Sequence, residues 1–123
     1  MCKLVTVKLN NNNIRVADIK VKAIDNFIDK ISYLKGIERA VLFGSALEER
    51  CTEESDIDVA LFGTMTENEF FVNGATGKFK RELAKGIGLK EVYDILYFKN
   101  DAINADSMIM NEIREKGKEI YAV

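Results

Sequence analysis

Hydrophobic and polar positions follow two different periods along the 123 residues of the chain. Alternating or continuous short runs of apolar residues are typical of strands, and apolar residues at three- and four-residue spacing are typical of helices. Strand patterns cover residues 5–9, 37–43, 56–62 and 92–98. Helical patterns cover residues 18–34, 78–85 and 107–116, and Thr66 with the glutamates after it has the features of another helix start.

The segments between these elements are polar or rich in glycine. We expect residues 10–13 to form a polar loop, and we expect Gly74 and Gly77 to weaken any helix before residue 78. Residues 92–98 are rich in aromatic and β-branched side chains, which predicts a third central strand. Strands and helices alternate without a repeat or a linker, so the sequence predicts one α/β or α+β domain over residues 1–123.

Composition limits the chemistry that the chain can perform. The net charge of -2 leaves no basic surplus that would favour nucleic acid or an anionic membrane. The absence of histidine excludes Ser-His-Asp and Cys-His catalysis and histidine-bound zinc. Cys2 and Cys51 are expected to be free thiols, and no apolar run approaches the ~20 residues that span a bilayer. We therefore expect a cytoplasmic protein.

Two aspartates stand at the start of the strand predicted after the polar, turn-like residues 44–55. Residues two apart in a strand project from the same face, so Asp56 and Asp58 are expected to lie side by side. Two such charges repel by roughly 4 kcal/mol at ~4 Å and an effective dielectric near 20. A shared proton or a hard cation such as Mg²⁺ would relieve this repulsion. The simpler alternative is a strand end that faces water.

A third carboxylate, Asp94, interrupts an apolar strand pattern. Aspartate is a poor strand former, and burying its charge without a partner is unfavourable. If this strand lies next to residues 56–62, Asp94 joins the same acidic cluster, and three carboxylates around one or two metal ions suit phosphoryl or nucleotidyl transfer. If the strand is an exposed edge, Asp94 simply faces water.

Gly44 and Ser45 directly follow the apolar strand 37–43, and ten residues separate them from Asp56. Glycine allows close approach of a ligand to the backbone, and a serine hydroxyl with neighbouring N–H groups can hold phosphate oxygens. Alone, this dipeptide is only a turn. Its spacing from the two aspartates, together with Asp94, favours a metal-dependent site that handles phosphates.

The run from Leu42 to Leu61 resembles the signature of the nucleotidyltransferase superfamily shared with DNA polymerase β, and its spacer is similar to that of the minimal nucleotidyltransferases. This resemblance implies a short mixed sheet with helices packed mainly on one face. It implies that Gly44 and Ser45 hold the nucleoside triphosphate and that Asp56 and Asp58 bind one or two Mg²⁺ ions. Asp94 would complete the metal site and act on the acceptor hydroxyl.

The chain departs from the family pattern just after Ser45. The usual small residue and Ala-Arg-Gly are replaced by Leu47, Glu48, Glu49 and Arg50, so acidic residues stand near a site meant for phosphates and the arginine is displaced. Arg50 either substitutes in part or is an exposed loop residue. A second basic stretch, Lys78, Lys80, Arg81 and Lys85, is either a solvated helix face or faces the site.

The resemblance further implies a function. Minimal nucleotidyltransferases are often antitoxins beside a HEPN-domain toxin, which predicts transfer of AMP from ATP to a toxin tyrosine, with this toxin or a second copy of the chain as partner. One alternative is a catalytically silent fold that neutralises a partner by contact. Another is a small-molecule or antibiotic nucleotidyltransferase, but its acceptor-binding domain is not encoded in these residues.

Overall fold

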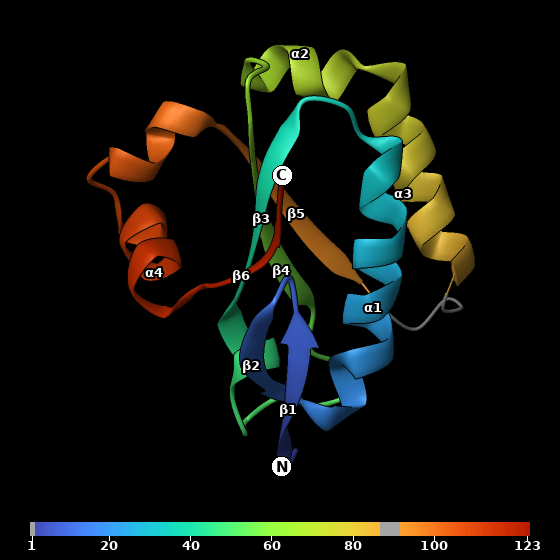
Figure 1. Cartoon of the computed structure of the whole chain (residues 1–123), viewed down its shortest axis with the longest axis vertical. Helices are drawn as coiled ribbons and strands as arrows, with labels where there is room; N and C mark the ends of the chain where they lie inside the picture. Colours follow the sequence, from blue (N-terminus) through green and yellow to red (C-terminus); the bar gives the residue numbers. More distant parts are fainter. Residues whose placement is uncertain (1, 87–91) are drawn as a thin grey trace.

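The computed structural model describes residues 2–86 and 92–123. The strands of this part are β1 (Leu4–Leu9), β2 (Asn12–Ala17), β3 (Ile37–Phe43), β4 (Ile57–Gly63), β5 (Tyr93–Lys99) and β6 (Lys118–Ala122). The α-helices are α1 (Val21–Lys30), α2 (Glu67–Val72), α3 (Gly74–Gly86) and α4 (Met108–Lys116). The 3₁₀ helices are Asp18–Lys20, Ile31–Tyr33, Gly44–Leu47 and Asn100–Asn104. Figure 1 shows their arrangement.

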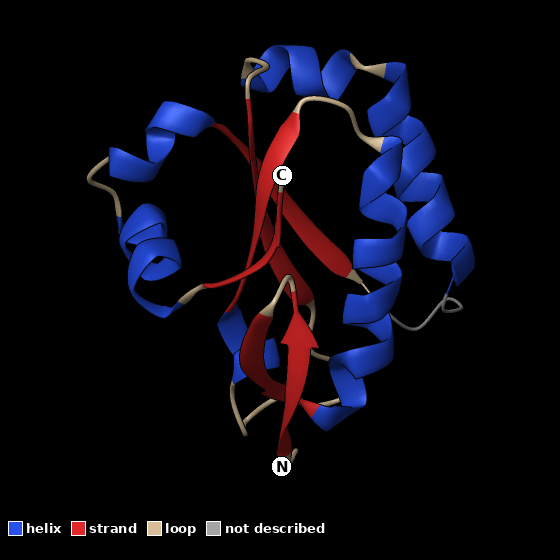
Figure 2. Ribbon diagram, in the orientation of Figure 1, coloured by secondary structure: helices blue, strands red, loops and turns tan. Residues whose placement is uncertain are grey.

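A four-stranded mixed sheet forms the centre of the fold, in the order β5-β4-β3-β6. Strand β4 runs parallel to β5, and β3 runs antiparallel to both β4 and β6. The prediction of a mixed sheet is confirmed, as Figure 2 makes visible. The prediction that residues 92–98 form a central strand is wrong, because β5 lies at the edge. Its apolar residues are explained by burial of both of its faces.

Helices cover both faces of the sheet, but unequally. One face packs against α1, α2 and α3 through a large apolar cluster that includes Phe27, Leu61 and Phe79. The other face packs against α4, where Met110 and Ile113 contact a smaller cluster around Phe62. Figure 1 shows α1 and α3 side by side, with α4 on the opposite side of the sheet. Helices therefore lie mainly on one face, as expected.

Local signals place most helix ends. The Thr66 hydroxyl accepts a hydrogen bond from the Glu69 N–H, and the Glu69 carboxylate accepts one from the Thr66 N–H, which forms a capping box at α2. At α4 the Ser107 hydroxyl accepts a hydrogen bond from the Met110 N–H and so caps the helix, without the reciprocal bond. Helix α3 starts earlier than predicted and runs through both Gly74 and Gly77, because its buried Phe79 and Leu83 outweigh the weak helix propensity of glycine.

The N-terminal hairpin of β1 and β2 corrects another expectation. Residues 10–13 are not a loop: the turn is made by Asn10 and Asn11, which have φ values of 49° and 64°, and β2 begins at Asn12. Asparagine tolerates this left-handed backbone, so two residues are enough to reverse the chain. Strand β2 then packs against the 3₁₀ helix Gly44–Leu47 and against β6.

Lys20 anchors the loop that leads to the acidic residues. Its side chain is fully buried, and its ammonium donates a hydrogen bond of 3.2 Å to the carbonyl oxygen of Glu53. Burying an ammonium group is tolerated only with such partners, so this contact holds the loop before β4 against the start of α1. The sequence analysis did not single out Lys20.

Across residues 2–86 and 92–123, the helices are too short or too polar for any of them to cross a lipid bilayer.

Packing of α4 against the sheet leads to a first prediction. Replacing the buried Ile113 by alanine should lower the free energy of unfolding by about 2–5 kcal/mol, because it leaves a cavity between α4 and β3. The matched control is Glu115→Ala on the exposed side of the same helix, which should change it by less than about 0.5 kcal/mol. Urea unfolding followed by circular dichroism measures both, and equal midpoints for the two variants would contradict the packing described.

Candidate functional site

Two of the predicted carboxylates meet because β4 and β5 are parallel neighbours. Asp58 pairs with Asp94 in the register of these strands, so the two carboxyl groups lie within electrostatic reach of each other. Asp58 shares the α4 face of the sheet with Ala60 and Phe62, so its carboxyl lies where that apolar cluster ends. Asp94 is exposed on the edge strand and also lies next to Asp58, so the structure combines the two positions that the sequence offered for it as alternatives.

Burial and like charges act together on Asp58. Desolvation is the largest cause, followed by the charges of Asp94 and Asp56, and together they raise the pKa of Asp58 from 3.8 to about 6. A smaller contribution comes from Glu112 on α4. A carboxyl with such a pKa is poised to accept either a proton or a cation near neutral pH.

Gly44 closes the site on the other side. Its backbone has a φ of +78°, and a Cβ atom built on it would lie 2.3 Å from Oδ2 of Asp58. Only glycine satisfies both conditions, so the Gly-Ser turn and the first carboxylate of β4 fit each other directly. The following Ser45 is half-buried in the 3₁₀ helix that ends at Leu47.

The donor set suits a hard divalent cation, although the cluster is incomplete as it stands. Asp58 and Asp94 offer oxygen ligands, and their mutual repulsion is what a bound Mg²⁺ would relieve. Asp56 is exposed one residue before β4. Within residues 2–86 and 92–123, no group of three acidic or cysteine side chains is arranged as a ready metal site. A three-carboxylate site would therefore require the Asp56 side chain to turn toward the other two.

The loop between Gly44 and Asp56 gives Arg50 a partner other than phosphate. The Arg50 guanidinium forms an ion pair with Glu48, and this contact raises the pKa of Arg50. The backbone carbonyl of Glu49 accepts a hydrogen bond of 3.0 Å from the Cys2 N–H, which fastens the N-terminus to the loop. The position of Arg50 therefore agrees with an exposed loop residue better than with an arginine that replaces the family's arginine at the phosphates.

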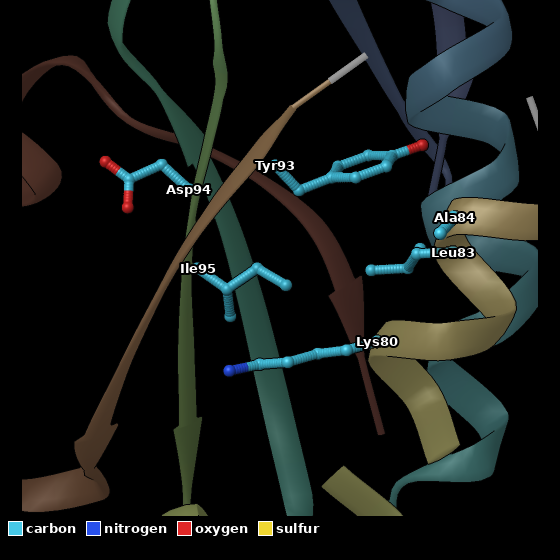
Figure 3. A pocket seen from close by; sticks show the side chains of 6 residues that line it. All are labelled: Lys80, Leu83, Ala84, Tyr93, Asp94 and Ile95. Carbon is cyan, nitrogen blue, oxygen red and sulfur yellow. The ribbon is translucent and has the colours of Figure 1, made fainter. Parts of the chain in front are cut away.

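A hollow of about 360 Å³ lies beside β5 at the position of Asp94 (Figure 3). It lies between α3 and β5 and is lined by Lys80, Leu83, Ala84, Tyr93, Asp94 and Ile95. In Figure 3 the Lys80 side chain extends from α3 toward β5, whereas Asp94 points away from the side that carries Tyr93. Lys80 is therefore a pocket residue, while Lys78 lies over the ring of Tyr33, 5.1 Å from its centroid.

Glu112 is the acidic residue that the sequence analysis missed. It lies eighteen positions beyond Asp94 on α4, and only the packing of this helix on the sheet brings its charge within electrostatic reach of Asp58. Glu112 precedes the buried Ile113 in an ordinary amphipathic helix, so no local motif marks it.

The fit between Gly44 and Asp58 yields a prediction. Gly44→Ala should lower the free energy of unfolding by about 1–3 kcal/mol, because the new methyl group would meet the Asp58 carboxyl at a left-handed backbone position. Gly74→Ala is the matched control, since a Cβ there meets nothing within 4 Å and alanine favours the helix. Chemical unfolding of both variants tests this, and a Gly44→Ala protein as stable as the control would refute the geometry.

The raised pKa of Asp58 predicts how stability depends on pH in the metal-free protein. The folded-state value of about 6 exceeds the ordinary value of 3.8, so the stability linked to this proton is complete below pH 4 and is lost as the pH rises through 6. Asp58→Asn removes this loss. In EDTA, the variant should be more stable than the wild type at pH 7.5, and the difference should shrink toward pH 4. Parallel stability profiles from pH 4 to 7.5 would contradict the prediction.

Comparisons with known proteins agree with this fold. The chain is similar to a structure of the toxin–antitoxin MntA–HpeT carrying two aspartate-to-glutamate changes, with 16% identity, a TM-score of 0.54 and coverage of 81% of this chain and 73% of that chain. It is also similar to a toxin–antitoxin structure with AMP-PNP, with 18% identity, a TM-score of 0.55 and the same coverage. At these identities the likeness establishes the fold.

A third structure, a tri-AMPylated HEPN toxin from Shewanella oneidensis with an MNT antitoxin, has 17% identity, a TM-score of 0.48 and coverage of 82% of this chain and 71% of that chain, which is too weak to support a conclusion. A search of curated proteins finds no match. Residues 22–122 match the family model described as polymerase beta, nucleotidyltransferase. The chain therefore belongs to the polymerase beta nucleotidyltransferase family.

Proposed function

We propose that this chain transfers AMP from ATP to a hydroxyl group of a partner protein, in a reaction that depends on Mg²⁺. The observation that carries the proposal is the pair of carboxyls, Asp58 and Asp94, which are in register on adjacent strands and set against the Gly44 backbone. Membership of a nucleotidyltransferase family supports the reaction class, and the likeness to a toxin–antitoxin structure with AMP-PNP supports an adenine nucleotide.

Each site residue has a role in this proposal. Asp56, Asp58 and Asp94 hold one or two Mg²⁺ ions, which supply charge neutralisation for the triphosphate. Gly44 allows the phosphates to approach the backbone, and Ser45 holds a phosphate oxygen. Because Asp58 is partly desolvated, its interaction with a cation is stronger than it would be in water.

Asp94 is also the residue that acts on the acceptor. It is exposed on the edge strand β5, and its side chain points away from the hollow beside α3, so an acceptor hydroxyl that approaches this edge could donate its proton to the Asp94 carboxylate. The hydroxyl oxygen then forms a bond to the α-phosphorus, the bond from this phosphorus to the bridging oxygen breaks, and pyrophosphate leaves.

We propose a HEPN-domain toxin as the acceptor protein, modified on tyrosine, with this chain as its antitoxin. The support is the sequence resemblance to minimal nucleotidyltransferases together with the fold that the chain shares with the toxin–antitoxin MntA–HpeT. An acceptor from outside the chain also agrees with the open position of Asp94 on an edge strand, where a second protein can approach.

A second candidate function is a silent module that neutralises its toxin by contact alone. Two observations favour it: the described residues hold no ready three-carboxylate site, and Glu48 and Glu49 bring negative charge to the loop after Ser45. Activity of the isolated chain toward its partner separates the two candidates.

The test uses the protein with Mg²⁺, labelled ATP and the product of the neighbouring gene. We expect label on the partner, and we expect Asp58→Asn to reduce the rate by about 10²-fold or more, because the metal that neutralises the phosphates would lose a main ligand. The matched control is Asp101→Asn, an exposed carboxyl in the 3₁₀ helix after β5, which should transfer label at the wild-type rate. Equal neutralisation of the partner by wild type and Asp58→Asn, without label, would establish the silent module instead.

A further inference from the structure

The N-terminal hairpin and α4 enclose a second hollow beside Gly44, with a volume of about 500 Å³. Its polar lining includes Arg15 from β2, Glu48 from the loop, Glu112 and Lys116 from α4, and Lys118 from β6. The family match begins at residue 22, so Arg15 belongs to a part of the chain outside that match. Two parts of the chain that are distant in sequence, the hairpin and the junction of α4 with β6, thus bring cations to this hollow.

These cations are available to a ligand. Arg15, Lys116 and Lys118 are exposed, and among residues 2–86 and 92–123 none of them forms a salt bridge. Glu48, by contrast, is already paired with Arg50. With the charge of Glu48 offset in this way, the hollow carries three positive charges against the single uncompensated negative charge of Glu112.

The strand register places Lys118 near the level of the acidic pair. Asp94 pairs with Asp58, Asp58 pairs with Phe43, and the neighbouring Leu42 pairs with Lys118. Two strand spacings, about 10 Å, separate the backbones of Asp58 and Lys118. Their side chains leave opposite faces of the sheet, because Asp58 shares the face of Phe43 and Lys118 shares that of Leu42. Gly44, directly after Phe43, both adjoins the Asp58 carboxyl and lines the hollow, so it connects the two.

We infer that Arg15, Lys116 and Lys118 bind the polyphosphate of the nucleotide, so that it crosses Gly44 from the cationic hollow to the acidic pair. The inference rests on the proposed function and names its phosphate contacts. It also accounts for the missing Ala-Arg-Gly after Ser45: the hairpin, α4 and β6 provide the positive charge that the loop lacks. Arginine can bind phosphate oxygens through two N–H groups, and lysines act as mobile point charges beside it.

Glu112 gives this hollow a selectivity that a purely cationic pocket would lack. Its charge lies near both Asp58 and Arg50 and opposes an anion that arrives without a metal. A triphosphate without Mg²⁺ should therefore bind more weakly than the cations alone would allow. Removing the charge of Glu112 should strengthen metal-free binding, which distinguishes this arrangement from a nonspecific positive patch.

Binding of the fluorescent analogue TNP-ATP to the full chain in EDTA tests the inference without the metal or the reaction. Arg15→Ala with Lys116→Ala should weaken binding about tenfold or more, and Glu112→Gln should tighten it about threefold. Inorganic triphosphate should displace the probe, adenosine should not, and added NaCl should weaken binding. Lys8→Ala is the matched control, because Lys8 is exposed on the same hairpin and does not line the hollow.

The outcomes separate the inference from the proposed function. Wild-type affinity in the double variant, displacement by adenosine as readily as by triphosphate, or no wild-type binding in EDTA would overturn the cationic site. Label transfer with an unchanged KM for ATP in the double variant would also overturn it while leaving the enzyme intact. Binding that depends on Arg15 and Lys116, without label transfer to the partner, would support the hollow and refute the proposed reaction.

Discussion

The repulsion between two neighbouring carboxyls governs this site. Asp58 and Asp94 cannot move apart, because the parallel hydrogen bonds of β4 and β5 fix their register and apolar clusters on both faces of the sheet fix the strands. Burial is the largest cause of the raised pKa of Asp58, and the fixed neighbours add to it. Packing of the strands thus holds the two carboxyls in an arrangement that is unfavourable alone and that a bound cation would make favourable.

The same constraint explains the shape of the surrounding chain. Gly44 must lack a side chain because Oδ2 of Asp58 occupies the space where a Cβ would stand. The loop that follows is held at both ends, by Cys2 at the Glu49 carbonyl and by the buried Lys20 at the Glu53 carbonyl. These contacts hold the backbone of the loop that joins Gly44 to the start of β4.

Local patterns predicted the elements, and tertiary pairing decided the site. The apolar strands before Gly44 and after Asp56, and the cap at Thr66, follow from neighbouring residues alone. The meeting of Asp94 with Asp58 depends on which strands pair, so the sequence could only offer it as one of two alternatives. Strand β2 was missed because its first residues, Asn12 and Asn13, are as polar as the turn before them. Glu112 was missed because its relation to Asp58 exists only once α4 packs on the sheet.

The carboxylates and the cations of this site need different precision in their placement. The segment that matches the family supplies the carboxylates and the glycine, which need the exact register of adjacent strands. Charges that act on phosphates tolerate looser placement, because a lysine or arginine reaches its partner through a long flexible side chain. Such charges can therefore come from peripheral elements such as the hairpin and the end of α4, even where the loop after Ser45 is acidic. A departure from the family pattern in that loop does not by itself remove the means of holding a nucleotide.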